Sequence, residues 1–140
     1  SKLMAVVNFT QNEEIGRLVP FRNAQDARTQ AFAFGNSLNL VAGTVVGQVT
    51  ATKKLKAYAS GNSDGSEIPI GVLEYDVVTN ATGKVQGYVG ERLDYAFEHS
   101  SVFLVGEFKV SELTGLDANA ITKLGRVFNS GTEGVLRMIR

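Results

Sequence analysis

Three side chains that could form a hydrolase triad occur close together in the second half of the chain. Asp94 and His99 are followed directly by Ser100 and Ser101, and carboxylate, imidazole and hydroxyl are the groups of an acyl-transfer triad. A triad also needs its nucleophile on a strained turn beside an oxyanion hole, and no G-x-S-x-G frame is present. In an extended segment, His99 and Ser100 point to opposite faces. We therefore predict no catalytic residues and interpret His99 as a surface residue. A small β-fold enzyme using Asp94, Glu98 and His99 is the alternative from another functional class.

A second group of residues has part of the spacing of a calcium-binding loop. Ser60, Asn62 and Asp64 occupy alternate positions ahead of a glycine, as the first ligands of an EF-hand loop do. The first of these positions carries serine instead of aspartate, and the position of the bidentate glutamate falls on Gly71. Because Asp64 is the one carboxylate at these positions, the sequence predicts a turn and no metal site.

Composition excludes several further functional classes. The chain has no cysteine, so disulfides, thiolate metal sites and a cysteine nucleophile are excluded. No G-x-G-x-x-G or P-loop pattern occurs, and we predict no cofactor. The 14 Lys and Arg residues balance the 14 Asp and Glu residues. Proteins that bind nucleic acid usually carry an excess of basic residues, so this class is disfavoured. No run approaches the roughly 18 apolar residues of a membrane helix. The sequence predicts a protein that is made in a cytoplasm and binds neither nucleic acid nor membrane.

The elements that would position these residues are mainly strands. The chain of 140 residues contains 15 glycines, 2 prolines and no tryptophan, which favours short strands joined by tight turns. Strands are expected over 44–52, 55–58, 68–78, 85–90 and 101–110, with a closing hairpin formed by 127–128 and 134–139.

One helix is predicted near the C-terminus. Asp117 can cap residues 118–124, and Gly125 can end the helix. Residues 94–99 are a weaker second helix candidate. The fold class is therefore mainly β (α+β), with one or two short helices.

The N-terminal quarter of the chain has a different pattern. Residues 1–36 carry bulky apolar side chains without a lasting helical or strand period, so we interpret them as an extended arm preceding a β-rich domain over residues 37–140. A frayed terminus is the alternative. A free tail would gain little from the apolar arm residues, which are Val6, Val7, Phe9, Ile15, Leu18 and Phe21.

Several motifs in order resemble the lambda-type bacteriophage head decoration proteins. The resemblance covers residues 38–140 and rests on Ala42–Leu55, Asp64-Gly65-Ser66, Pro69–Leu73, Asp76-Val77, Val105–Phe108, Leu113 and Leu124–Val127. No motif of the family aligns with the arm.

The resemblance implies a fold, a function and partners. Members have a small β-tulip domain, assemble as homotrimers and bind the outer surface of the expanded head at three-fold and quasi-three-fold sites. There they hold neighbouring copies of the major capsid protein together, and a flexible N-terminal segment orders on the capsid. The chain is thus expected to be a non-enzymatic structural protein of the virion that stabilises the capsid. Another small β-fold virion subunit, such as a tail-tube or head-completion protein, is the alternative.

The arm is the expected capsid-binding element. Val6, Val7 and Phe9 have strand-forming side chains, and no proline before Pro20 removes a backbone donor. We expect the arm to add a strand to an exposed edge of the shell protein.

Overall fold

The computed structural model describes residues 14–139, which form eleven strands, one α-helix and two 3-10 helices. The mainly β prediction is confirmed. The predicted arm residues Val6, Val7 and Phe9 lie outside the described residues. The strands are β1 (Arg28–Phe32), β2 (Asn39–Leu40), β3 (Val45–Gln48), β4 (Leu55–Ala57), β5 (Pro69–Leu73), β6 (Val77–Val78), β7 (Val85–Val89), β8 (Arg92–Phe97), β9 (Ser100–Lys109), β10 (Gly125–Ser130) and β11 (Glu133–Met138). The helices are η1 (Ala24–Asp26), η2 (Val110–Glu112) and α1 (Ala118–Leu124).

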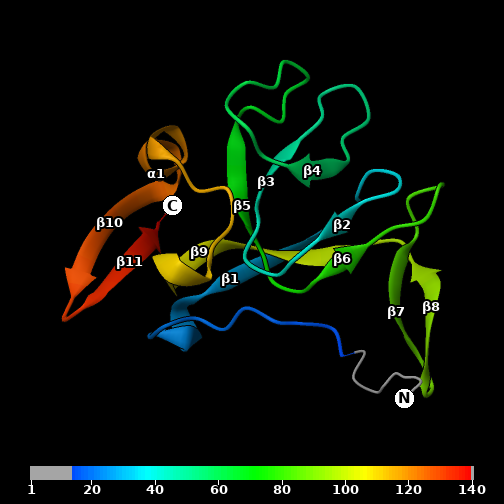
Figure 1. The fold of residues 1–140 in the computed structure, drawn as a ribbon, viewed down its shortest axis with the longest axis horizontal. Helices are drawn as coiled ribbons and strands as arrows, with labels where there is room; N and C mark the ends of the chain where they lie inside the picture. The colour runs from blue at the N-terminus through cyan, green and yellow to red at the C-terminus, as the bar shows by residue number, and fades with distance from the viewer. Residues whose placement is uncertain (1–13, 140) are drawn as a thin grey trace.

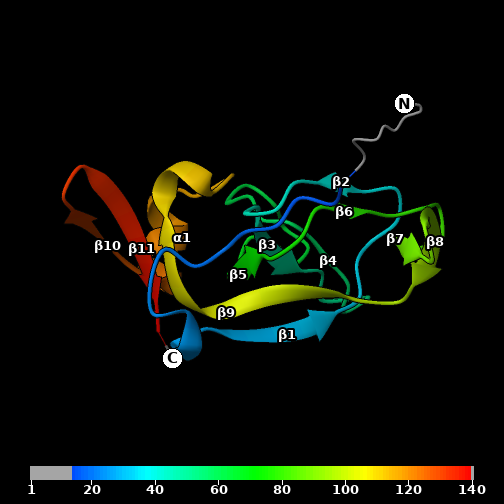
Figure 2. The same cartoon turned by 90° about the horizontal axis from the view of Figure 1, so that it is seen from below.

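The ten-residue strand β9 organises the main sheet. This sheet has seven strands in the order β10-β11-β9-β5-β3-β4, and β1 also pairs with β9. Each of these pairings is antiparallel. Figures 1 and 2 show β9 running through the body of the molecule with β1 alongside it. The strand expected over 101–110 is thus confirmed as the central strand.

Neighbouring residues on the central strands enter two different hydrophobic clusters. Val45 packs in the first cluster and Val46 in the second, and Val102 and Phe103 are divided in the same way. Successive side chains of a strand point to opposite faces, so both faces of the sheet are covered. The strand expected over 44–52 is therefore buried on both faces as β3, and it is shorter than expected, because it ends at Gln48.

The helix prediction is right for one segment and wrong for the other. Asp117 caps α1 by accepting a hydrogen bond from the Ala120 backbone N–H at 2.8 Å. That bond, together with one from the Tyr58 hydroxyl, lowers the pKa of the Asp117 carboxyl. The weaker candidate over 94–99 is instead occupied mostly by β8, whose residues pair with β7 from Val85 to Val89. Its aromatic side chains suit a strand.

Two hairpins project from opposite ends of the long axis. The closing hairpin β10–β11 is confirmed and joins the main sheet through β9. The β7–β8 hairpin is a separate two-stranded sheet at the other end (Figure 1). The single strand expected over 68–78 is divided into β5 and β6. Between these strands, the backbones of Glu74 and Asp76 are hydrogen-bonded to Leu18 and Gly16.

Candidate functional site

The described part of the predicted arm begins with a segment that lies along the domain, and we call residues 14–22 the strap. Backbone hydrogen bonds attach it at two places. The Leu18 N–H donates to the Glu74 carbonyl at 2.7 Å, and the Asp76 N–H donates to the Gly16 carbonyl at 3.0 Å. Further along, the Phe21 N–H donates to the Glu107 carbonyl at 2.7 Å. The strap therefore pairs with the domain in the manner of a short added strand.

Two buried carboxylates receive the arginines of the strap. Glu74 and Glu107 are 7% and 8% exposed. Arg17 pairs with Glu74 at 3.2 Å, and Arg22 Nε donates to Glu107 at 2.8 Å. The Asn23 amide adds a third bond, to Glu107 at 3.0 Å. The hydrogen bond from Arg22 is the main reason that the pKa of Glu107 lies below its ordinary value.

The three described arm residues have different surroundings. Leu18 is 4% exposed and belongs to the first hydrophobic cluster. Phe21 is half-buried, and the Lys109 ammonium lies 5.6 Å from its ring centroid. Ile15 lines a groove at the start of the strap. The predicted site residues thus divide into two that remain partly accessible and one that stabilises the core.

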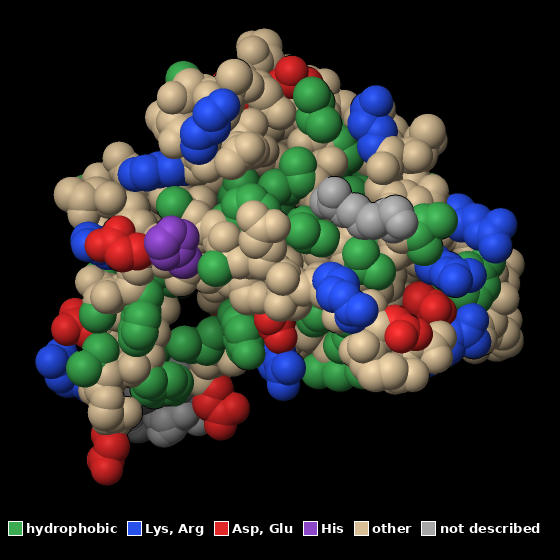
Figure 3. All heavy atoms as spheres, turned by 180° about the vertical axis from the view of Figure 1, so that it is seen from behind, with side chains coloured by type: hydrophobic (Ala, Val, Ile, Leu, Met, Phe, Trp, Pro, Cys, Tyr) green, Lys and Arg blue, Asp and Glu red, His purple; other side chains and the backbone are tan. Residues whose placement is uncertain are grey.

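An apolar groove of about 530 Å³ lies where the described chain begins, between the strap and the β7–β8 hairpin. Apolar side chains contributed by the strap, by β7 and by β8 line it, namely Ile15, Val85, Tyr88 and Phe97. Figure 3 shows a hollow between the hairpin and the body, with hydrophobic side chains on the hairpin. Tyr95 and Phe97 of the hairpin are 40% and 41% exposed. This end of the molecule therefore combines the start of the strap with accessible apolar surface.

The candidate triad residues have other partners. The Asp94 carboxylate accepts hydrogen bonds from Arg92 at 3.0 Å and from the Tyr95 backbone N–H at 2.9 Å. His99 is exposed, as expected for a surface residue. Neighbouring Glu98 pairs with Lys84, which lowers the pKa of the Glu98 carboxyl. Within residues 14–139, no hydrogen bond joins Asp94 to His99.

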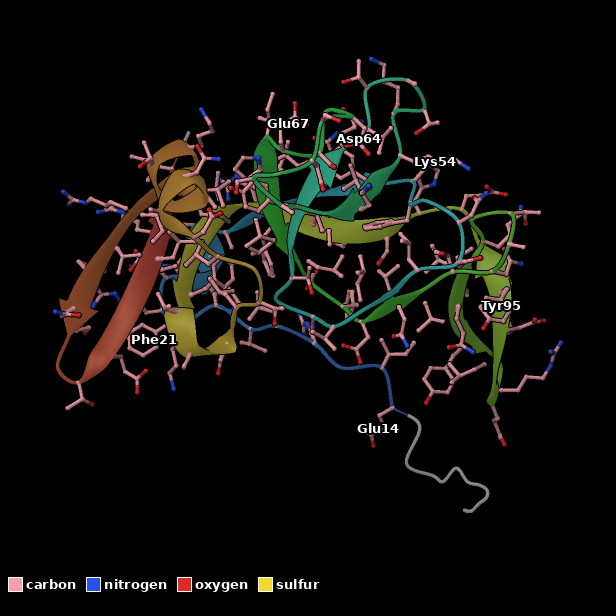
Figure 4. The ribbon with its side chains drawn as sticks, turned by 45° about the horizontal axis from the view of Figure 1, so that its top comes forward. Glu14, Phe21, Lys54, Asp64, Glu67 and Tyr95 are labelled. Atoms are coloured by element: carbon pink, nitrogen blue, oxygen red, sulfur yellow. The ribbon has the colours of Figure 1, made fainter. Side chains whose placement is uncertain are left out.

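The loop with part of the EF-hand spacing, residues 60–66, is held by hydrogen bonds to Asp64 from within the loop and from β4. Asp64 accepts bonds from the Ser66 backbone N–H at 3.1 Å and from Lys56 Nζ at 2.9 Å. Ser66 and Lys56 keep the pKa of the Asp64 carboxyl far below its ordinary value. Figure 4 places Asp64 and Glu67 at the edge of the molecule opposite Glu14, where the strap begins. The turn prediction is confirmed, and the loop is remote from the groove.

In the part of the chain from 14 to 139, no three His, Asp or Glu side chains gather as a metal site would require. Over the same residues, no helix has the length and apolar character needed to cross a membrane.

The sequence does not identify Glu74 and Glu107 as the carboxylates that pair with the arginines of the strap. Glu107 lies inside the predicted strand 101–110, and Glu74 lies inside the predicted strand 68–78. A charged residue within a predicted strand can face solvent, because successive side chains point to opposite faces. The sequence pattern therefore shows neither that these two carboxylates are buried nor that Arg17 and Arg22 pair with them.

Comparison with known proteins gives one match. The family model described as bacteriophage lambda head decoration protein D matches residues 9–102, which is 94 of the 140 residues. The matched range begins inside the predicted arm and includes the strap, although the motifs quoted above began only at residue 42. It ends within β9, so α1 and the β10–β11 hairpin lie beyond it. The searches of curated proteins and of solved structures gave no match.

Proposed function

The chain belongs to the bacteriophage lambda head decoration protein D family, and from that membership we propose how it acts on the phage head. The protein binds the outer surface of the expanded head as homotrimers at three-fold and quasi-three-fold sites. It contacts the major capsid protein, stabilises the shell and catalyses no reaction. The family match is the observation that carries this proposal.

The N-terminal arm is the proposed capsid-binding element. Its residues 1–13 precede a strap whose backbone already pairs with residues 74–76, so this part of the chain suits strand addition to an edge of the shell protein. Val6, Val7 and Phe9 supply the apolar side chains. Ile15 and Phe21 extend this contact surface along the strap. Leu18 contributes indirectly, because its side chain lies in the core.

The face that carries the groove is proposed to meet the shell. The described chain begins beside exposed aromatic side chains of the β7–β8 hairpin that line the groove, Tyr88 and Phe97. When a partner covers exposed apolar surface of this kind, its removal from water contributes favourable free energy to binding. The balanced charge of the chain suits the outer surface of the head, away from packaged nucleic acid.

A trimer fits a three-fold site because both have the same rotational symmetry. Ordering about ten arm residues costs roughly 1–2 kcal/mol per residue. Burying about five large apolar side chains returns roughly 1.5–3 kcal/mol each, so one arm alone binds weakly. Three arms on one rigid body bind strongly, because the first contact raises the effective concentration of the others.

The direct experiment mixes purified protein with expanded, undecorated heads and images the product. We expect density on the outer surface at the three-fold positions, and greater survival of heat or osmotic shock. Identical inactivation of decorated and bare heads would contradict stabilisation. Density in tails, or rings formed by the free protein, would favour a tail-tube or head-completion subunit instead.

A further inference from the structure

One carboxylate connects three segments at the start of the strap. Asp76 Oδ2 accepts a hydrogen bond from the Gly16 N–H at 2.8 Å, and Asp76 Oδ1 accepts one from the Ala42 N–H at 2.8 Å. The Asp76 backbone N–H also donates to the Gly16 carbonyl at 3.0 Å. Asp76 therefore holds Gly16 from both its amide and its carbonyl and attaches it to the turn between β2 and β3.

The contact requires glycine at position 16. A Cβ atom added there would lie 2.7 Å from Asp76 Oδ2 and 2.9 Å from Asp76 Oδ1. Real Cβ atoms do not approach oxygen so closely, and the carboxylate would have to leave one of its donors. Its side chain is short, so it has little freedom to move without losing the bond to Gly16 or to Ala42.

The contact also lies at the boundary of the strap. Glu14 and Ile15, the two described residues before Gly16, line the groove below the β7–β8 hairpin. Figure 4 shows Glu14 at the lower edge of the domain, where the strap begins. In the residues described, Gly16 is the first position at which the backbone is hydrogen-bonded to the domain.

We propose that Asp76 is the positioning residue of the capsid-binding arm, because it fixes Gly16 on the domain and so fixes the end of the strap from which the arm acts. This inference rests on the proposed function of the arm. A fixed origin reduces the number of arm conformations that must be given up on binding. It also keeps the three arms of a trimer at a constant spacing, which maintains their effective concentration.

The test compares two glycine substitutions in the full-length protein. Gly16→Ala displaces the Asp76 carboxylate, whereas Gly61→Ala is the matched control, because nothing lies within 4 Å of a Cβ at that exposed position. We expect Gly16→Ala to bind expanded heads about tenfold more weakly than Gly61→Ala, which corresponds to about 1.4 kcal/mol. Both variants are measured below their melting temperatures, so that both are folded.

Amide hydrogen exchange supplies a readout of the contact itself. In Gly16→Ala, the amide of residue 16 should exchange faster, while the Leu18 amide keeps its protection because its acceptor is the Glu74 carbonyl. Asp76→Asn is the second variant. Its amide group retains one acceptor oxygen and places a donor against the other N–H, so the amide of Gly16 or that of Ala42 should exchange faster, and head binding should weaken.

The outcomes separate this inference from the proposed function. Faster exchange at residue 16 with unchanged head binding would overturn the role of Asp76, and so would unchanged exchange in both variants. If a chain lacking residues 2–13 binds heads as tightly as the full chain, residues 1–13 have no binding role. The positioning role of Asp76 and the proposed role of these residues then both fail, whereas head decoration, which rests on the family match, does not. If that deletion abolishes binding while Gly16→Ala binds normally, only the positioning role fails.

Discussion

The strap, residues 14–22, and the segment 28–34 are close in sequence, but the domain holds them by different interactions. The strap is attached through three backbone hydrogen bonds and two arginine–glutamate ion pairs, and it buries one large apolar side chain, Leu18. Residues 28–32 form β1, which pairs with β9 over its whole length, and Phe34 is completely buried in the second cluster. The strap lies on the finished domain, whereas residues 28–34 are part of it.

The difference concerns how easily each segment can be released. Polar contacts are largely exchanged for contacts with water when a segment detaches, whereas removing a buried phenylalanine exposes apolar surface and leaves a cavity. The boundary expected at residue 37 falls three residues after Phe34, inside the part of the chain that the sheet and core hold. We therefore expect the segment before β1 to detach more easily than β1 itself.

The largest expected effect is at Phe34. Phe34→Ala should lower the free energy of unfolding by about 3–5 kcal/mol, because the side chain is fully buried between strands. Phe97→Ala is the matched control, since Phe97 is 41% exposed, and its effect should be much smaller. Chemical denaturation measures both. Equal effects would show that residues 28–34 are not part of the core.

Leu18 tests how firmly the strap is attached. Leu18→Ala should lower the free energy of unfolding by about 2 kcal/mol. This is the lower end of the range for a buried leucine, because the strap can shift to close the cavity. The neighbouring Val19 is 56% exposed, so Val19→Ala should change the free energy of unfolding by less than about 0.5 kcal/mol. A loss for Leu18→Ala as large as that for Phe34→Ala would remove the proposed distinction between the segments.

The ion pair between Arg22 and Glu107 should make the strap sensitive to acid. The pKa of Glu107 is lowered in the folded protein, so this pair stabilises the fold above the ordinary glutamate pKa of about 4.3. The contribution is lost as the pH falls through the lowered value. Glu107→Gln should reduce the free energy of unfolding at pH 7 by about 1 kcal/mol, and the difference from the wild type should shrink toward pH 3.

Arg22→Gln removes the arginine of the same ion pair and should therefore also weaken the pH dependence of the free energy of unfolding. Arg126 is exposed on β10, and Arg126→Gln serves as the control for loss of a positive charge. Urea denaturation across the pH range measures all three variants. If the free energies of unfolding of Glu107→Gln and the wild type differed by the same amount at every pH, the stabilising role of the Arg22–Glu107 ion pair would be contradicted.

The smallest effect is expected at the opposite edge of the molecule. Residues 60–66 are held by contacts within the domain, including the bond from Lys56 to Asp64 at 2.9 Å. A chelator should therefore change neither the melting temperature nor head binding. A lowered melting temperature that calcium restores would show that the loop holds a metal.

The sequence predicted the elements that depend on local signals. Helix α1 was found from its Asp117 cap, and β9 from its long alternating run, because neighbouring residues determine both. The assignment of 94–99 failed, because pairing with β7 decides the conformation of β8.

The strap could not be predicted, since its partners lie far away in the sequence. Arg17 and Glu74 are separated by 57 residues, and Arg22 and Glu107 by 85. No local pattern identifies which arginine meets which glutamate. The partner of β1 is equally distant in the sequence, since residues 28–32 pair with β9, and no local pattern in residues 28–34 indicates that pairing.

The central claim is that residues 1–13 of the arm bind the shell while the rest of the chain folds independently of them, and deleting residues 2–13 tests this most directly. The deletion leaves the strap, the contact of Gly16 with Asp76, and Phe34 in place. Affinity for expanded, undecorated heads is measured for the shortened and the full chain, together with both melting temperatures. We predict that head binding falls by about two orders of magnitude or more, which corresponds to at least about 2.7 kcal/mol, and that melting is unchanged. Equal affinity of the two chains would contradict the account and would move the binding surface to the β domain.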